Sequence, residues 1–310
     1  MTIITDHKTP EQIIRKYLAK QAAAERQAAE EAQRLADEER QRRVAASGSA
    51  RRDPSIAQPP ATATAVGDFL RLENIVCTDA DDQVFEQYPE LYVRKDVFKD
   101  AAGDIVYFTA YDGAAHAEQQ GCFAPSMALS CTMLAALFQA VVEKQTAGTY
   151  RTKDAALEQV LLQFKNKSNG SDGHRQNTLV NWGTQQIIHY PTNSDFLSNG
   201  GTQNINTIRP RTALGFNRKG LSNMDLEEAL RHKNVARYVK NLTGLSDPSV
   251  LVEIGQYFGL TAQVLVSSDD ETRTVWLGCD SKNFNLIADF GTSLTGVVRG
   301  VRSSAPLGAP

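Results

Sequence analysis

The chain has 310 residues and a formal net charge of -3, with 41% hydrophobic and 22% charged residues. This balance excludes a global basic field that would draw the protein onto nucleic acid, so any such contact has to come from a local patch. No apolar run reaches the ~18 residues of a membrane span, and the first ten residues lack the basic and apolar regions of a secretory signal. We therefore expect a soluble protein, cytoplasmic at synthesis, that makes no membrane contact.

Residues 1–46 are expected to form a charged helical arm. Thr9 and Pro10 suit the N-cap and the first helical position. The stretch that follows is almost all Ala, Glu, Gln and Arg, which are strong helix formers, and a helix that is polar all round buries no face. The arm should therefore project into solvent. It carries one apolar patch at helical spacing that we expect to bind a partner: Ile13, Ile14, Tyr17 and Leu18.

Basic residues gather where the arm ends and the next segment begins. They are Arg40, Arg42, Arg43, Arg51 and Arg52. Such a cluster can contact phosphates, which makes these arginines the candidate nucleic-acid-binding residues. The alternative is a solvated face that complements the dipole of the helix C-terminus. Residues 47–66 are rich in Pro, Ala and Thr and are expected to form an extended linker.

Residues 67–300 are expected to form a globular body, with a disordered tail over residues 301–310. Residues 68–113 indicate short strands and turns, and the composition of 104–113 favours a strand. Residues 118–144 contain a helix that should be largely buried, because its apolar face is so wide. Apolar periodicity also predicts helices over residues 152–166, 223–244 and 247–260.

The rest of the body contains a long polar region and a late hairpin. Asn, Gln, Gly, Ser and Thr dominate residues 167–223, where the one strand-like run is 185–190, and loops of this length are usually functional or mobile. Residues 261–268 indicate a strand, and residues 272–291 indicate two strands joined by a turn at 281–283. The expected fold class is α+β: a helix-rich globular body with a late β-hairpin, preceded by an exposed helical N-terminal arm.

The four cysteines form no CxxC pair and fit no metal-ligand spacing. No cofactor motif is found, so we expect neither a metal nor a cofactor. Cys122 is the one thiol that invites a catalytic interpretation. It follows Gly121 at the expected start of the buried helix, where the dipole would lower the pKa of a thiol. The simpler alternative is that Cys122 fills space as a small apolar residue.

A cysteine flanked by Gln and Gly, as in "EQQGCFAPSMALSC", resembles the nucleophile helix of papain-like and transglutaminase-like cysteine enzymes. The hairpin "TVWLGCDSKNFNLIADFG" is similar to the one that carries their other catalytic residues, and the resemblance makes Asp289 the acid. The strand from Thr272 to Gly278 departs from those families because it lacks the histidine that serves as general base. His189, in the strand-like run, is the best substitute.

Three functions follow from these features. We favour a structural, self-assembling protein of the virion or coat type, because an exposed arm that cannot bury itself is explained if it lies on a neighbouring subunit or on nucleic acid. This interpretation makes the protein a homo-oligomer and leans away from an enzyme. The first alternative is a cysteine hydrolase or transferase that uses Cys122, for example as a delivered effector. The second is a non-enzymatic module that binds a partner through residues 167–223.

Overall fold

A computed structural model describes residues 62–146, 149–165, 173–199, 212–290 and 295–303. The chain divides into two units, Met1–Gln58 and Pro59–Pro310. The predicted helical arm, with its apolar patch and its five arginines, lies outside the described residues. Most of the predicted linker and the tail beyond residue 303 also lie outside them. The account below concerns the second unit.

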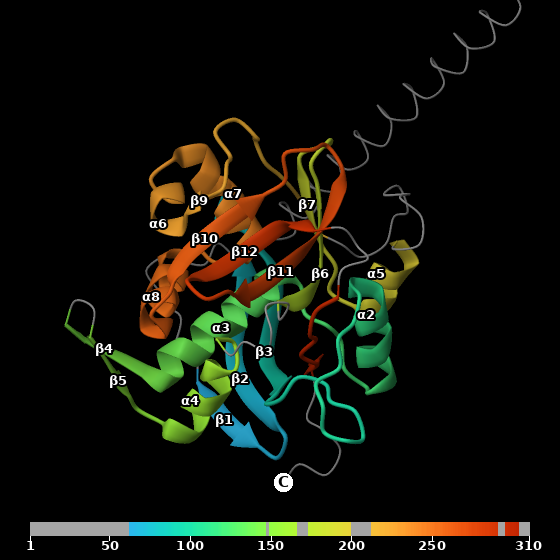
Figure 1. Cartoon of the computed structure of the whole chain (residues 1–310), viewed down its shortest axis with the longest axis vertical. Helices are drawn as coiled ribbons and strands as arrows, with labels where there is room; N and C mark the ends of the chain where they lie inside the picture. The colour runs from blue at the N-terminus through green and yellow to red at the C-terminus, as the bar shows by residue number, and fades with distance from the viewer. Residues whose placement is uncertain (1–61, 147–148, 166–172, 200–211, 291–294, 304–310) are drawn as a thin grey trace, which may run out of the picture. The chain divides into compact units, whose positions relative to one another are not determined.

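The described strands form three sheets (Figure 1). A four-stranded antiparallel sheet has the order β1-β2-β3-β13, and a two-stranded ribbon pairs β4 with β5. A seven-stranded sheet has the order β8-β7-β6-β11-β12-β10-β9, in which β10 and β12 run parallel and the other neighbours antiparallel. The strands are β1 Ala63–Val66, β2 Phe69–Thr78, β3 Val84–Arg94, β4 Val142–Thr146, β5 Thr149–Thr152, β6 His174–Asn181, β7 Gln186–His189, β8 Thr212–Gly215, β9 Met224–Asp225, β10 Thr261–Val266, β11 Thr272–Cys279, β12 Asn283–Phe290 and β13 Val301–Arg302.

Seven helices are present in the described ranges. They are α2 Ala110–Gln119, α3 Met127–Val141, α4 Ala155–Leu162, α5 Asn193–Asn199, α6 Leu226–Ala229, α7 Lys233–Thr243 and α8 Ser249–Phe258. Helices α4 and α8, the strand β10 and the late hairpin of β11 and β12 confirm the corresponding sequence predictions.

The prediction of a helix-rich body is wrong, because more of the described residues lie in strands than in helices. Two long strands, β2 with 10 residues and β3 with 11, occupy a region where short strands and turns were expected. Strands β6 and β8 lie within residues 167–223, which were predicted to be loop apart from 185–190. The tendency of a segment to form a strand depends more on its packing against neighbouring elements than on its own residues. The sequence therefore predicted too few strands in the polar segments.

Two further segments differ from their predictions. Residues 104–113 were expected to form a strand, but the chain makes isolated bridges at Ile105 and Phe108 and then enters α2. Thr109 caps this helix by accepting a hydrogen bond from the Asp112 N–H at 3.2 Å. The single helix expected over 223–244 is divided into β9, α6 and α7, because β9 pairs with β10 and is drawn into the sheet.

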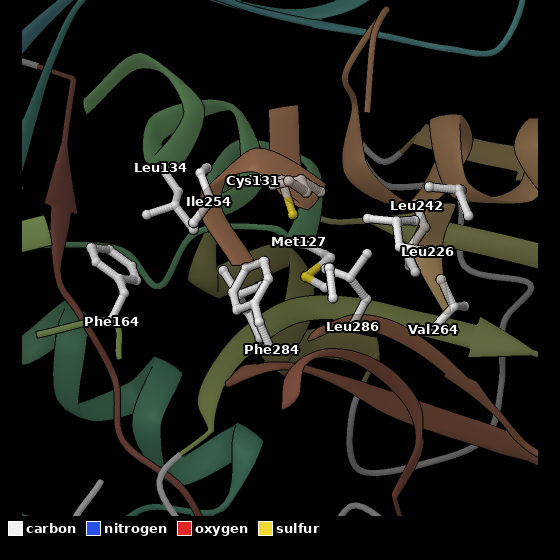
Figure 2. Close-up of a cluster of buried hydrophobic side chains, with 14 of the residues drawn as sticks. Met127, Cys131, Leu134, Phe164, Leu226, Leu242, Ile254, Val264, Phe284 and Leu286 are labelled. Carbon is white, nitrogen blue, oxygen red and sulfur yellow. The ribbon is translucent and has the colours of Figure 1, made fainter. Parts of the chain in front are cut away.

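Helix α3 is the centre of the body. It packs against β2 of the four-stranded sheet on one side and against β6 and β11 of the seven-stranded sheet on the other. Helices α4, α7 and α8 cover the remaining surface. This enclosure explains why the helix is buried almost all round, as its sequence predicts. Figure 2 shows Met127, Cys131 and Leu134 of α3 in the main core, with Phe284 and Leu286 of β12.

Strand β6 is buried along its whole length. One face meets α3: Gln176 accepts a hydrogen bond from the Ser130 hydroxyl at 2.5 Å, and Thr178 accepts one from the Met127 N–H at 2.8 Å. The other face lies under α2 and α5, where Leu179 packs with Phe196. With both faces covered, the polar side chains of this strand have to find partners inside the protein.

Candidate functional site

Cys122 lies in the connection between α2 and α3 and is not at a helix N-terminus. The N-cap of α3 is Ser126, whose hydroxyl accepts from the Leu129 N–H at 3.1 Å. Cys122 stands four residues earlier, after a left-handed turn at Gly121, where φ is +63°. A helix dipole acts only within the first turn of its helix. The predicted effect of the dipole on the Cys122 thiol is therefore not supported.

The backbone around Cys122 is firmly held. Its N–H donates to the Ala117 carbonyl at 2.8 Å, and its carbonyl accepts from Asn193 Nδ2 at 2.9 Å. Asn193 Oδ1 in turn accepts from the Ala124 N–H and from Asn177 Nδ2, at 2.8 and 3.1 Å. Asn193 thus ties the cysteine loop to the start of α5 and to the inner strand β6 of the large sheet.

A guanidinium group lies directly beside the thiol. Arg302 donates from Nε to Cys122 Sγ at 3.4 Å and from Nη2 to the Gln120 carbonyl at 2.8 Å. These contacts use two of the five N–H groups that a guanidinium carries. Sequence analysis missed Arg302, which lies in the tail predicted to be disordered. Residues 301–302 instead form β13, which pairs with β3. No local sequence signal identifies such a short edge strand.

Cys122 and Arg302 line a surface pocket of about 250 Å³. Its other lining residues are Glu118, Gly121, Phe123, Thr192, Asn193, Ser194, Val301 and Ser303. The residue Cys122 is only 6% exposed, so the pocket gives a small part of the thiol access to solvent. The arrangement can receive a small polar group beside a sulfur atom and a cation.

His189 is placed elsewhere, with both ring nitrogens engaged. The Asn241 carbonyl lies 2.8 Å from His189 Nε2 and can only accept, so Nε2 carries the proton of the neutral ring and donates to it. Nδ1 is then an acceptor and receives the Thr178 hydroxyl proton at 2.9 Å. The ring also stacks on Phe85, with centroids 5.4 Å apart. Burial lowers the pKa of His189 to about 4.

The three residues suggested as a catalytic set are not brought together. Thr178, Asn241 and Phe85, the contacts of His189, do not line the Cys122 pocket. Asp289 is exposed on β12, where its charge adds to the hydrogen bond with Asp269 that raises the pKa of Arg273. His189 therefore serves the interior of the sheet, and the pocket has to be judged by Cys122 and Arg302.

A second candidate site is the ribbon formed by β4 and β5. It continues directly from α3 and extends away from the body (Figure 1). At its base, the Tyr150 ring meets Phe138 and Tyr257 edge-on, with centroids 6.0 and 5.6 Å apart. Lys144 also forms an ion pair with Glu253. Farther out, the described ribbon residues are exposed, and many are polar or charged.

No group of His, Cys, Asp and Glu side chains in the described ranges is arranged to hold a metal ion. None of the helices in those ranges is long and apolar enough to cross a membrane. Comparison with protein-family models, with curated protein sequences and with solved structures finds no match for this chain.

Proposed function

We propose that this protein is a self-assembling structural protein of the virion or coat type, whose N-terminal arm and β4–β5 ribbon contact neighbouring copies. The observation that carries the proposal is the ribbon. Strands β4 and β5 pair with each other and with no further strand in the described sheets. Each therefore has a free backbone edge, and such an edge is a template for pairing with another chain.

The low intrinsic stability of a two-stranded ribbon supports a role in contacts with other molecules. A two-stranded hairpin is at best marginally stable by itself. Here the Tyr150 contacts and the Lys144–Glu253 ion pair hold the base in place, while the outer residues bury little surface. Glu143 and Arg151 face each other across the ribbon and discourage indiscriminate pairing, as charges on edge strands do.

The sequence adds a second support. An arm with one apolar patch and no other face to bury is suited to a neighbouring subunit, and residues Arg40 to Arg52 would supply contacts to packaged nucleic acid. The proposal therefore assigns two contacts between copies, one from each unit of the chain.

The mass and shape of the purified protein test this proposal. We expect light scattering and negative-stain images of the full chain to show large regular particles or filaments, with excess absorbance at 260 nm if the arginines hold nucleic acid. A chain without residues 1–58 should stay folded, because β1 and its pairing with β2 are retained, but should lose assembly. A monomeric full chain, or a truncated chain that assembles equally well, would contradict the proposal.

A shortened ribbon separates the role of the ribbon from that of the arm. Lys144 and Tyr150 are register partners, so residues 145–149 can be replaced by Asn-Gly, which closes a two-residue hairpin turn. The contacts at the base of the ribbon stay. The critical concentration for assembly should rise at least tenfold. Replacing Ser281 and Lys282, in the exposed turn between β11 and β12, by alanine is the matched control and should leave assembly unchanged.

The Cys122 pocket favours a second candidate, a cysteine hydrolase or transferase. A thiol beside a guanidinium in an open pocket has a nucleophile and a group that can bind an anionic or carbonyl oxygen. His189 is not available as base in this arrangement, so the proton acceptor would have to come from the substrate or from solvent.

Selective alkylation tests this second candidate. Cys77 and Cys131 are fully buried, and burial raises the pKa of both thiols, so we expect them to stay unmodified by iodoacetamide at neutral pH. Cys122, which lines a pocket, should react at least tenfold faster than either, as followed by peptide mass spectrometry. A Cys279→Ser variant removes the half-buried competitor. If Cys122 is as unreactive as the buried pair, the cysteine enzyme is excluded.

A further inference from the structure

A small cavity of about 10 Å³ shares no lining residue with the Cys122 pocket. It is lined by residues before and within the first half of α3, by β6, by Phe164 beyond the end of α4 and by the segment that leads into β13. The lining residues are Pro125, Ser130, Met133, Phe164, His174, Arg175, Gln176 and Arg299. This volume is enough for one occupant of atomic size.

The lining is positively charged and deeply buried. Arg175 is 1% exposed and Arg299 is 2% exposed. Their guanidinium groups lie over aromatic rings, Arg175 over Trp276 at 4.1 Å and Arg299 over Phe164 at 4.6 Å. No Asp or Glu is among the described residues that line the cavity. Arg175 Nη1 donates to the Thr274 hydroxyl at 3.3 Å. A buried charge is costly unless it is compensated, so the buried guanidinium of Arg299 needs an explanation.

Arg299 is bound by neutral oxygens only at its outer nitrogens. Nη1 donates to the carbonyls of Arg94, at 2.6 Å, and Lys95, and Nη2 donates to Gln163 Oε1 at 3.0 Å. Asp96 acts on this group at longer range and through Gln163, whose amide donates to Asp96 Oδ1 at 2.9 Å. The buried Nε–H of Arg299 has no hydrogen-bond partner among the described residues.

The other polar groups of the lining are either committed to each other or are donors. The Ser130 hydroxyl donates to Gln176 Oε1 at 2.5 Å, and Gln176 Nε2 donates to the His174 carbonyl at 3.0 Å. His174 is 4% exposed, and its Nδ1 is a second buried atom without a partner in the described part of the chain. In the Nδ1–H tautomer this atom becomes a donor into the same space.

We propose that the cavity is a binding site for one small inorganic anion of the halide class, held by the Nε–H of Arg299 and the Nδ1–H of His174, with the charge of Arg175 close by. The anion neutralises part of the buried positive charge and gives each unpartnered nitrogen an acceptor. Its place between α3, β6 and the segment before β13 makes it a structural ion that joins three parts of the chain distant in sequence.

A single water molecule is the competing occupant. Water would accept from Arg299 and donate to His174 Nδ1, with no effect on the buried charge. An anion and a water differ in two measurable ways, because only the anion gives a binding curve with halide concentration and only a heavy halide scatters anomalously.

Bromide is the probe. In crystals of the full chain grown with sodium bromide, we expect an anomalous difference peak in the cavity beside Arg299 Nε. In solution, raising sodium bromide should raise the melting temperature by about 3 °C in a saturable way, since a ligand that binds only the folded state stabilises it. Sodium gluconate at the same ionic strength should not, because its anion is too large for the cavity.

A pair of conservative variants provides the control. Arg299→Lys removes the Nε–H but keeps the charge, and it should lose the bromide-dependent shift. Arg218→Lys changes a surface arginine that pairs with Asp270, and it should keep the shift. If Arg299→Lys fails to fold, the anomalous difference map of the bromide crystals and the comparison of bromide with gluconate still test the proposal on the unmodified chain. A cavity without an anomalous peak, or equal stabilisation by both salts, would overturn the proposal.

Discussion

In halide-free buffer, acidification from pH 7 to pH 4.5 is expected to cost the folded body about 5 kcal/mol, because two buried histidines have to stay neutral. Burial lowers the pKa of His189 to about 4, and burial together with the charge of Arg299 lowers the pKa of His174 to about 3. A loss of this size is comparable with the whole stability of many domains. The body should therefore unfold at a mildly acidic pH.

The sign follows from the protons that each state binds. In the unfolded chain these histidines take up protons near their ordinary pKa of 6.5, whereas in the folded body they remain neutral down to about pH 4 and pH 3. The unfolded state thus binds more protons as the pH falls below 6.5, and each histidine lowers the free energy of unfolding by about 1.4 kcal/mol per pH unit. Well above pH 6.5 the histidines are neutral in both states, and the full free energy of unfolding is retained.

The geometry at His189 explains the low pKa in atomic terms. His189 Nε2 donates to the Asn241 carbonyl, which can only accept, so Nδ1 of the neutral ring accepts the Thr178 hydroxyl proton. A proton on Nδ1 would force that hydroxyl to turn away from the ring. The charged ring would also lie against Phe85 with no carboxylate among its described contacts. Protonation therefore costs desolvation, which the hydrogen bond to the Asn241 carbonyl offsets only in part.

Carboxyl groups with shifted pKa values change the free energy of unfolding in the opposite direction or at lower pH than the two histidines. Burial raises the pKa of Glu86, so this group favours the folded state as the pH falls and opposes the histidines in part. The pKa values of Asp269 and Asp280 are lowered to about 2, and their contributions are lost only below about pH 4. The window between pH 6.5 and 4.5 therefore reports mainly on the histidines.

Urea unfolding at a series of pH values measures this effect. Both tryptophans of the chain, Trp182 and Trp276, lie in the body, so their fluorescence follows it selectively. We expect a His189→Gln variant to halve the slope of unfolding free energy against pH from about 2.7 kcal/mol per unit. His232→Gln, at an exposed position, is the control and should keep the full slope. An unchanged slope in His189→Gln would show that His189 is not held neutral.

Gly244→Ala is expected to destabilise the body by about 2–4 kcal/mol, and Gly259→Ala by only about 1 kcal/mol. Both glycines end helices in the left-handed conformation, Gly244 after α7 at φ +66° and Gly259 after α8 at φ +68°. An L-residue pays a similar backbone cost at each position, so the difference between the two variants comes from packing alone.

Packing differs because the end of α7 is pressed into the centre of the body. A Cβ atom at Gly244 would lie 2.7 Å from the Ala128 Cβ and 3.1 Å from the Cys77 Cβ, whereas a Cβ atom at Gly259 would meet nothing within 4 Å. The Gly244 carbonyl also accepts from the Thr78 N–H at 2.8 Å, which limits how far the loop can move. Urea midpoints of the two variants measure the difference. Equal losses would mean that α3 and β2 can move apart without cost.

Several elements follow from the sequence by itself, because their patterns are local. The apolar periodicity of α4 and α8 and the two strands and turn of the β11–β12 hairpin are complete within a short stretch. The width of the apolar face of α3 likewise predicts that the helix is enclosed, and α3 does lie between two sheets. For such elements the residues that form the structure also carry its signal.

Strand β6 shows what the sequence could not decide. Its residues "HRQNTLVN" contain too few apolar side chains to predict a strand, and they become one because α3 covers one face and α2 with α5 the other. Only those neighbours supply the partners that make burial of Gln176 and Thr178 possible. Polar composition alone therefore predicted a loop in place of an inner strand of the large sheet.

The candidate site likewise has features that the sequence predicts and features that depend on the tertiary structure. Sequence alone singled out Cys122 as a thiol before a buried helix, because the residue type and the helix are both local features. Only the tertiary structure decided that Ser126 caps that helix, that His189 is bound by Thr178 and Asn241, and that Arg302 lies at the thiol. Each of these depends on contacts between residues far apart in the chain, which packing creates and periodicity does not record.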